Sequence, residues 1–526
     1  MISYASFSFF LLFFGITALL YSMVPQKIRW VVLLLGSYAF YFVSSKGNII
    51  PFIVITLIVW GSGLLIQKMN DTMKLKRKQA SSKEEKKSIR AKYNQYKRRI
   101  LALGAVLVVL ILLFCKYINF FIGTLNLIPA LNIKELSVIQ PLGISFFVLE
   151  GISYIADVYY GKIEAEKNPL KISLFLSFML TVVEGPIARY EQLGKQLCTC
   201  KYNNLEDVSK GYVRTCWGLF KKVVIADRAV LLVSGVFDNY ESYSGLPVAC
   251  AILFYTLQLY CEFSGVMDIM CGLGRMLGIE LPENFKQPFF AKSINEFWQR
   301  WHISLGTFLR DYIFYPVSLS KGIKNISAKT KEKFNQYYAS LIPTSIALFF
   351  VWFTNGFWHG SGWKYIVYGL YYYFLMMLGL FFKPLTDKLC NKLKINTESK
   401  GFGYFAVFRT FIIVNFGMLI FRADNLKVAF HMFASLFRWG DISALIPGAE
   451  NSIEINFYDY AVILIGFIAI LIVGILKERK IDIIEKIYRL PFALKFVLYL
   501  AAIFVIIIIG AYGEGYGVVD LIYANF

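Results

Sequence analysis

The amino-acid sequence predicts an all-α polytopic membrane protein with about 11–13 transmembrane or re-entrant helices. Hydrophobic residues make up 57% of the 526 residues, and the mean hydropathy is +0.56. Apolar windows recur from one end of the chain to the other, and many approach the roughly 20 residues that a spanning helix needs. The windows are continuous and do not alternate in polarity, which favours helices over a transmembrane barrel.

The expected spans follow these windows in chain order, and no internal repeat or low-complexity linker divides them. We therefore expect one membrane domain over residues 1–526. The span limits are 7–22, 30–45, 49–67, 100–121, 138–160, 211–236, 247–263, 264–278, 340–358, 363–382, 403–421, 457–475 and 490–512.

Three further segments are not expected to form full spans. Segment 170–187 contains Glu184-Gly185-Pro186 near its end, a charge followed by two helix breakers. This pattern favours a re-entrant or cavity-lining piece. In segments 286–315 and 424–438, charged residues alternate with aromatic ones at helical spacing. We expect both to form interfacial amphipathic helices.

The net charge of +21 is concentrated in a basic run at 74–99, which lies between two apolar windows. Such a run is typical of a cytoplasmic loop, with contacts to anionic lipid headgroups as a by-product. Aromatic residues do not interleave with the basic run as stacking platforms do, so we expect no nucleic-acid partner. Tracing the spans outward from this loop places both termini, including the tail 513–526, outside the cell membrane.

The cysteines give no sign of a metal site. Of the eight cysteines, only Cys198 and Cys200 are close in sequence, and no histidine lies nearby. Zinc sites use closely spaced Cys and His ligands, so we expect no bound metal.

The histidines are the strongest candidates for chemistry, because an ionisable side chain at membrane depth usually lines a functional cavity. His359 lies in the apolar run VWFTNGFWHGSGW. It is either a general base for a hydroxyl nucleophile or a buried histidine held by a carbonyl, and the membrane context favours the base. His302, in NEFWQRWHISLG, is either a second acid–base group or an interfacial ring. His431 is expected to pack at the interface.

A polar cluster lies within apolar sequence between 258 and 275. Glu262 and Asp268 are six residues apart and do not share a helix face, and Gly265 is a candidate helix break between them. We expect both acids to serve structure by pairing with Arg275 or Arg300. The sequence shows neither a phosphate-binding loop nor a Gly-x-Ser-x-Gly nucleophile elbow.

At these residues the chain resembles the membrane-bound O-acyltransferase superfamily. The resemblance rests on 263–314 and on WHGSGW at 358–363, and it extends to PLGISFFVLEGISYIADVYYGK, VVEGPIARY and FGMLIFRADNLKVAF. It is closest to the bacterial branch that O-acetylates exported polysaccharides such as alginate and peptidoglycan. The resemblance implies that the helices surround a central tunnel. It also implies that His359 is catalytic and that His302 is a second functional histidine in the same tunnel. It also implies tunnel-lining or substrate-positioning roles for Asn284, Trp298, Arg300, Trp301, Asp311 and Trp358.

The resemblance further implies an acyltransferase without a bound cofactor, whose donor is acetyl-CoA or another acyl thioester. Its partners would be membrane lipids and either an exported polysaccharide or an extracytoplasmic esterase-like acyltransferase. Two departures concern the exact substrate: the segment 315–320, and Glu150 where glutamine is frequent. Teichoic-acid D-alanyl transfer from a carrier protein is the first alternative. A transporter or flippase is the second, although the two symmetric halves of such proteins are not visible.

The C-terminal sequence LIYANF resembles the tail of bacterial partners of this acyl-transfer machinery. Tyr523 would then relay the acyl group outward. The alternative, that Tyr523 is only an aromatic residue that closes the last helix, is equally open.

Overall fold

The computed structural model describes residues 3–200, 204–331, 334–449, 452–512 and 516. Within these residues the chain is helical, and its one extended pairing is an isolated bridge between Phe285 and Trp301. The chain forms two compact units. Unit 1 consists of the described parts of 1–211 together with 270–282, and unit 2 of the described parts of 212–269 and 283–519. The single membrane domain stays a prediction.

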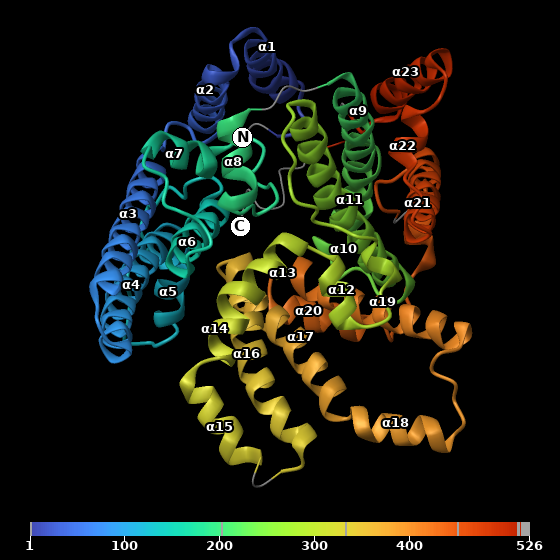
Figure 1. The fold of residues 1–526 in the computed structure, drawn as a ribbon. Helices are drawn as coiled ribbons and strands as arrows, with labels where there is room; N and C mark the ends of the chain where they lie inside the picture. The colour runs from blue at the N-terminus through green and yellow to red at the C-terminus, as the bar shows by residue number, and fades with distance from the viewer. Residues whose placement is uncertain (1–2, 201–203, 332–333, 450–451, 513–515, 517–526) are drawn as a thin grey trace. The chain divides into compact units, whose positions relative to one another are not determined.

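Unit 1 is built around an antiparallel pair of long helices, α3 and α4, with α6 packed against both (Figure 1). Its elements are the π-helical η1 (Phe9–Gly15), α1 (Ile16–Met23), α2 (Gln26–Ser44), α3 (Ile50–Gln79), α4 (Lys83–Leu112), η2 (Leu113–Tyr117), α5 (Ile118–Leu125), α6 (Ile144–Tyr160), α7 (Pro169–Ser177), η3 (Tyr190–Gly194), α8 (Lys195–Thr199) and the start of α9 (Leu205–Leu219).

Unit 2 contains the candidate functional residues, and its helices α16 and α17 lie side by side (Figure 1). Its elements after α9 are η4 (Phe220–Ala226), α10 (Asp227–Phe237), most of α11 (Leu246–Met276), η5 (Pro288–Phe290), α12 (Ile294–Arg300), α13 (Ile303–Leu309), η6 (Arg310–Phe314), α14 (Tyr315–Ser318), α15 (Lys321–Lys331), α16 (Gln336–His359), α17 (Trp363–Phe381), α18 (Lys383–Lys392), α19 (Lys400–Arg422), α20 (Leu426–Ser435), η7 (Ile442–Leu445), α21 (Phe457–Glu478), α22 (Ile483–Tyr488) and α23 (Phe492–Ile509).

Nine helices among the described residues are long and apolar enough to cross a membrane. This confirms the all-α polytopic class, while the central tunnel stays a prediction. The shorter helical stretch Phe9–Met23 is also apolar. The nine helices are Gln26–Ser44, Ile50–Gln79, Lys83–Leu125, Leu246–Met276, Gln336–His359, Trp363–Phe381, Lys400–Arg422, Phe457–Glu478 and Phe492–Ile509.

Two predictions about where helices end were wrong. The windows 247–263 and 264–278 form one continuous helix, α11, and Gly265 does not break it. A Cβ on Gly265 would lie 2.8 Å from the carbonyl oxygen of Gly218 and 3.1 Å from the amide nitrogen of Lys222. Glycine is needed there because two backbones approach closely, not because the helix ends. Only 80–82 of the basic run 74–99, which was expected to be a loop, is non-helical, whereas the window 211–236 is helical throughout and contains the π-helical η4.

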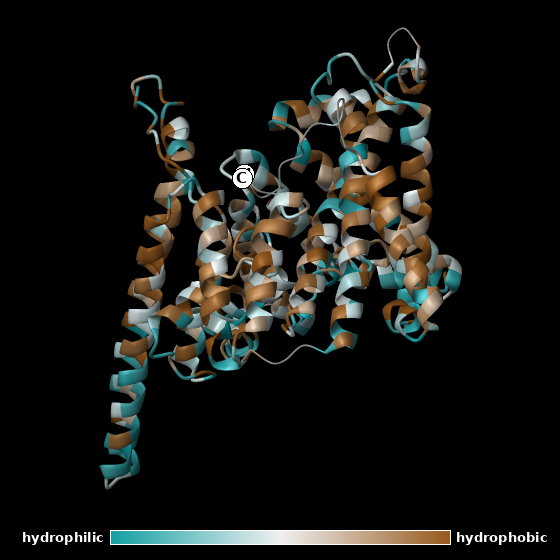
Figure 2. Ribbon diagram, turned by 90° about the horizontal axis from the view of Figure 1, so that it is seen from above, coloured by the Kyte–Doolittle hydropathy of each residue, from teal (hydrophilic) through white to brown (hydrophobic). Residues whose placement is uncertain are grey.

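The basic run continues the helices of the α3–α4 pair. Ser82 caps α4 by accepting a hydrogen bond from the amide of Glu85. Figure 2 shows the apolar residues of this pair giving way to hydrophilic residues toward one end. The basic residues are therefore carried on a helical hairpin instead of a flexible loop.

The segment 286–315 was predicted as an amphipathic helix, but it is divided into four helices, η5, α12, α13 and η6. The break between α12 and α13 falls at Trp301 and His302. The second predicted amphipathic segment, 424–438, contains the single helix α20. In 170–187, α7 ends at Ser177 and the chain continues through buried turns. A re-entrant position for this piece stays a prediction.

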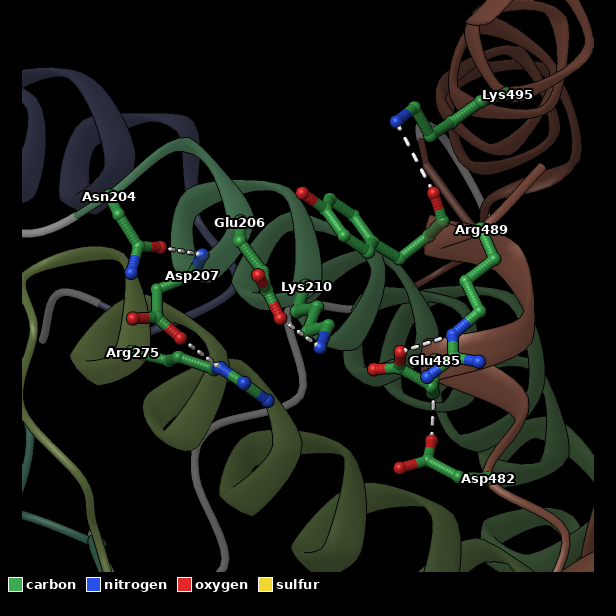
Figure 3. A network of polar contacts seen from close by, with 10 residues as sticks. Asn204, Glu206, Asp207, Lys210, Arg275, Asp482, Glu485, Arg489 and Lys495 are labelled. Atoms are coloured by element: carbon green, nitrogen blue, oxygen red, sulfur yellow. Dashed lines mark hydrogen bonds and ion pairs between the residues drawn. The ribbon is translucent and has the colours of Figure 1, made fainter. Parts of the chain in front are cut away.

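Arg275 was expected to pair with Glu262 or Asp268, and this expectation was wrong. Within unit 1, its guanidinium lies 3.0 Å from a carboxylate oxygen of Asp207, on α9 (Figure 3). The other pairs in this figure are local: Lys210 with Glu206 in unit 1, and Arg489 with Glu485 in unit 2.

Candidate functional site

His302 lies at the break between α12 and α13, in a left-handed backbone conformation with φ of 49°. Such a φ is uncommon outside glycine, although histidine adopts it more readily than bulky or branched residues. Two backbone hydrogen bonds hold the segment against the strand-like stretch 284–286. The amide of Lys286 donates to the carbonyl of Arg300 at 2.9 Å, and the amide of Ile303 donates to the carbonyl of Asn284 at 3.0 Å.

The side chain of Asn284 fixes the orientation of the His302 ring. Its Oδ1 lies 3.2 Å from His302 Nδ1. The same oxygen accepts a hydrogen bond from the backbone amide of Ser304 at 3.0 Å and another from the Ser304 hydroxyl at 3.0 Å. The backbone N–H of Ser304 can only donate, so the Asn284 atom that faces it must be the oxygen, which accepts. Nδ1 of His302, which faces the same oxygen, must therefore carry the proton. In the neutral ring the lone pair is therefore on Nε2.

His302 is only 3% exposed. Burial lowers the pKa of its imidazole well below the usual value, and the charge of His359 lowers that pKa further. Burial acts in this direction because a low-dielectric environment disfavours the imidazolium. The ring is therefore neutral at physiological pH.

His359 ends α16 and is 4% exposed. Aromatic rings surround it: the centroid of Phe421 lies 5.3 Å away and that of Tyr368 lies 5.9 Å away. The chain then turns at Gly360, where a Cβ would come within 2.2 Å of the ring of Tyr365. A glycine is therefore required for α16 to end at this histidine with Tyr365 packed below the turn.

The two histidines are connected by the indole of Trp358. The centroid of this ring lies 5.7 Å from that of His302 and 5.0 Å from that of His359. Trp358 is itself buried, with 5% exposure. The sequence-based expectation that the two histidine motifs belong together in space is thus supported by a shared neighbour.

Trp298 and Trp301, the other predicted tryptophans, both pack against the ring of Phe297. Trp298 lies edge-on to Tyr372 at 4.8 Å and to Tyr368 at 6.3 Å. Since Tyr368 also contacts His359, Trp298 is one ring removed from that histidine. Trp301 packs edge-on against Phe285 at 5.0 Å. The tunnel-lining or substrate-positioning roles of both tryptophans stay predictions.

The contacts of Arg300 and Asp311 lead away from the histidines. Arg300 pairs with Glu296 at 2.8 Å and with Glu478 at 2.5 Å. Asp311 pairs with its neighbour Arg310 at 3.0 Å. Their tunnel roles stay predictions. Tyr523, the possible acyl relay, lies outside the described residues.

The predicted site did not include Ser304, Tyr368 and Phe421. Ser304 follows His302 by two residues, and an N-terminal serine of a short helix is a familiar hydrogen-bonding signal. The aromatic rings gave no signal in sequence, because Tyr368 and Phe421 each lie among many other aromatic residues in apolar windows.

Glu262 and Asp268 do serve structure, but their predicted arginine partners were wrong. Lys222 pairs with Glu262 at 3.3 Å, and Lys221 pairs with Asp268 at 2.7 Å. Both lysines project from η4 and are almost completely buried. A buried charge requires an opposite charge nearby, so the adjacent lysines in an apolar window were the signal for these pairs.

Comparison with known proteins places the site in a family. The model of the membrane-bound O-acyltransferase family matches residues 166–331, a range that includes Asn284, Trp298 and His302. A probable alginate O-acetylase from Azotobacter vinelandii is 30% identical over 478 residues, which are 90% of this chain and 85% of the relative. A peptidoglycan O-acetyltransferase from Helicobacter pylori is 32% identical over 389 residues, 69% of each chain.

More distant matches have a different named activity. The teichoic acid D-alanyltransferase of Bacillus subtilis is 28% identical over 290 residues, which are 54% of this chain and 69% of the relative. The apolar helices and these matches together make the protein a multi-pass membrane acyltransferase. With its long alignments to the O-acetylases, the chain belongs to the membrane-bound O-acyltransferase family.

Proposed function

We propose that this enzyme transfers an acyl group, acetyl in the first instance, from a cytoplasmic thioester to a hydroxyl of an exported cell-envelope polysaccharide. The observation that carries the proposal is the pair of buried histidines on either side of Trp358. One of them, His302, is held by Asn284 in a defined tautomer. Two buried imidazoles in an aromatic enclosure suit proton transfer to and from a hydroxyl.

In the proposed reaction His359 is the general base. As its ring nitrogen takes the proton of the acceptor hydroxyl, the hydroxyl oxygen attacks the thioester carbonyl carbon. The carbon–sulfur bond then breaks, and the departing thiolate takes the proton from the imidazolium. One ester forms, one thioester is lost and the imidazole returns to its neutral form. His302 orients the reacting hydroxyl through the lone pair on Nε2.

The comparisons support the acceptor class. One relative is named a probable alginate O-acetylase and another a peptidoglycan O-acetyltransferase, and both names specify a polysaccharide acceptor. The proposed donor is acetyl-CoA or another acyl thioester, without a bound cofactor. We place the enzyme in the cell membrane with both termini on the outer face, where Tyr523 would be positioned to relay the acyl group.

D-alanyl transfer to teichoic acid is a second candidate, favoured by the match to the Bacillus subtilis enzyme. The two functions share the histidines and differ in the acyl group. Mass spectrometry of envelope polymers from a deletion strain separates them, because lost acetyl and lost D-alanyl groups have different masses.

The test of the proposed function is His359→Ala, with His431→Ala as its matched control. His431 contacts Tyr240 at a centroid distance of 5.2 Å, and its described contacts do not include the candidate site. We expect His359→Ala to lose envelope acetylation by at least about a hundredfold, with normal abundance in the membrane. His431→Ala should retain wild-type acetylation. Full acetylation in His359→Ala would refute the assignment.

A further inference from the structure

Unit 2 encloses a small polar cavity that the proposed reaction does not use. Its volume is about 50 Å³, larger than the ~30 Å³ that one water occupies in the liquid. It therefore accommodates a small head group but not a whole nucleotide. Its walls come from η4, α9, α11, α21 and the stretch before η5: Arg214, Trp217, Lys221, Tyr260, Ser264, Met267, Asp268, Glu283, Asn284, Phe285, Gln287, Ile470, Val473, Gly474 and Lys477.

Two of the cations in this wall are held in place by carboxylates. Arg214 makes a bidentate contact with Glu283, with both nitrogen–oxygen distances at 2.6 Å. Its Nε also donates to Asp268 at 2.9 Å. Lys221 Nζ donates to the other oxygen of Asp268 at 2.7 Å and to the Ser264 hydroxyl at 2.8 Å. These groups form a rigid, pre-oriented polar wall.

Lys477, at the end of α21, adds a third positive charge to the lining. Among the described residues, its ammonium makes no hydrogen bond or ion pair, and the side chain is exposed. The ionised lining thus contains three cations against two carboxylates. The excess positive charge is that of Lys477, whose exposed side chain can move toward a ligand.

Only the side chain of Asn284 lies between the cavity and the candidate catalytic residue His302. Asn284 lines the cavity, and its Oδ1 lies 3.2 Å from His302 Nδ1. Its Nδ2 contacts the sulfur of Met267, another lining residue, at 3.1 Å. A group bound in the cavity is therefore separated from His302 by a single side chain.

We propose that this cavity binds an anionic group of the acyl donor, namely a phosphate of a phosphate-bearing thioester, and that Lys477 closes over it. The inference rests on the proposed function. A phosphate accepts several hydrogen bonds and needs net positive charge around it, which Lys477 supplies. The reacting acetyl group is small and uncharged, so contacts to a charged part of the donor are needed to hold it.

The test measures binding of coenzyme A and of pantetheine, which lacks the phosphates, to the purified full-length protein. The variant is Lys477→Gln, which removes the charge and keeps most of the side-chain length. We expect its affinity for coenzyme A to fall about tenfold, the size of a lost charged hydrogen bond. Its affinity for pantetheine should not change. The matched control is Lys486→Gln, which removes an exposed charge on α22 outside the cavity and should bind both probes like the wild type.

Three outcomes would overturn the proposal: unchanged coenzyme A binding in Lys477→Gln, an equal loss for both probes, or weakened binding of a charged polysaccharide fragment with coenzyme A unaffected. The last would assign the anion to the acceptor. The His359→Ala variant separates this proposal from the proposed function. It should bind both probes normally while turnover stops, so the acyl-transfer proposal fails in turnover and the phosphate site fails in binding.

Discussion

The side-chain oxygen of Asn284 lies 3.2 Å from Nδ1 of His302, and it also accepts from the backbone amide of Ser304. The contact with the Ser304 amide shows that this oxygen is a hydrogen-bond acceptor, because a backbone N–H can only donate. Nδ1 of His302 must therefore be the donor in the first contact. The relationship fixes both the ring orientation and the tautomer of His302. It also means that a single substitution can change the charge state of the histidine while leaving its position intact.

Asn284→Asp is the substitution that uses this relationship. The carboxylate retains the acceptor oxygen but adds a negative charge beside the ring, which should raise the pKa of His302. More of the imidazole is then protonated at neutral pH and cannot accept a proton or a hydrogen bond. We expect the acid limb of the kcat profile to move to higher pH, with activity recovering as the pH rises. Saturating donor isolates kcat from any effect on the cavity, and an acid limb identical to that of the wild type would contradict the tautomer assignment.

The depressed pKa of His302 predicts how stability depends on pH. In the unfolded chain this histidine has an ordinary pKa near 6.5, whereas burial keeps it neutral in the fold to a much lower pH. As the pH falls through about 6.5, the unfolded state gains a proton that the folded state does not, so the free energy of unfolding decreases. His302→Gln should show a smaller fall in melting temperature between pH 7.5 and 5.5. Gly379→Ala, which changes no titratable group and whose new Cβ has no atom within 4 Å, serves as the control and should fall as much as the wild type.

Gly265→Ala tests the close packing of α11. The new Cβ would meet the carbonyl oxygen of Gly218 at 2.8 Å, and that oxygen belongs to a helix backbone that cannot rotate away. We expect a loss of about 1–3 kcal/mol in stability, typical of overpacking. Gly379→Ala on α17 has no atom within 4 Å of the new Cβ and provides the comparison. Melting temperatures in detergent measure both, and equal values for the two variants would argue against the tight contact.

The buried pair of Arg228 and Asp459 predicts a non-additive double substitution. The two side chains form an ion pair and are both 2% exposed, and the Tyr516 hydroxyl donates to Asp459 at 2.6 Å. Asp459→Ala leaves the guanidinium buried without its carboxylate, at a cost of about 3–5 kcal/mol. Arg228→Met combined with Asp459→Leu should recover a large part of that loss. A cycle of thermal melts checks this, and simple additivity would contradict it.

Much of the helix pattern was predictable, because each long apolar window needs its own span. The sequence alone could not indicate whether a glycine inside an apolar run ends a helix or allows another helix backbone to pack closely against it. At Gly265 the answer depends on Gly218, which is 47 positions earlier in the chain. Periodicity contains no information about such a pair.

The candidate site, too, was only partly predictable from the sequence. His302, His359 and Trp358 stood out because ionisable and glycine-flanked residues are rare in apolar sequence, and the structure brings them together. The partners of Glu262 and Asp268 were assigned to arginines on the strength of charge alone. The structure instead pairs both acids with the adjacent lysines of η4, since a π-helical turn directs two consecutive side chains to different acids on α11.

Because the basic run is helical, the distance from the end of the apolar sequence in α3 to the tip of the hairpin follows from the number of residues between them. Apolar sequence in α3 ends near Ile66, and the helix continues to Gln79, which at 1.5 Å per residue is roughly 20 Å further. A Debye length at physiological salt is about 8 Å. The charges nearest the tip of the hairpin are therefore beyond the electrostatic influence of the lipid surface. We therefore expect only the charges at its base to contribute to orienting the chain in the membrane, while those at the tip face the aqueous phase.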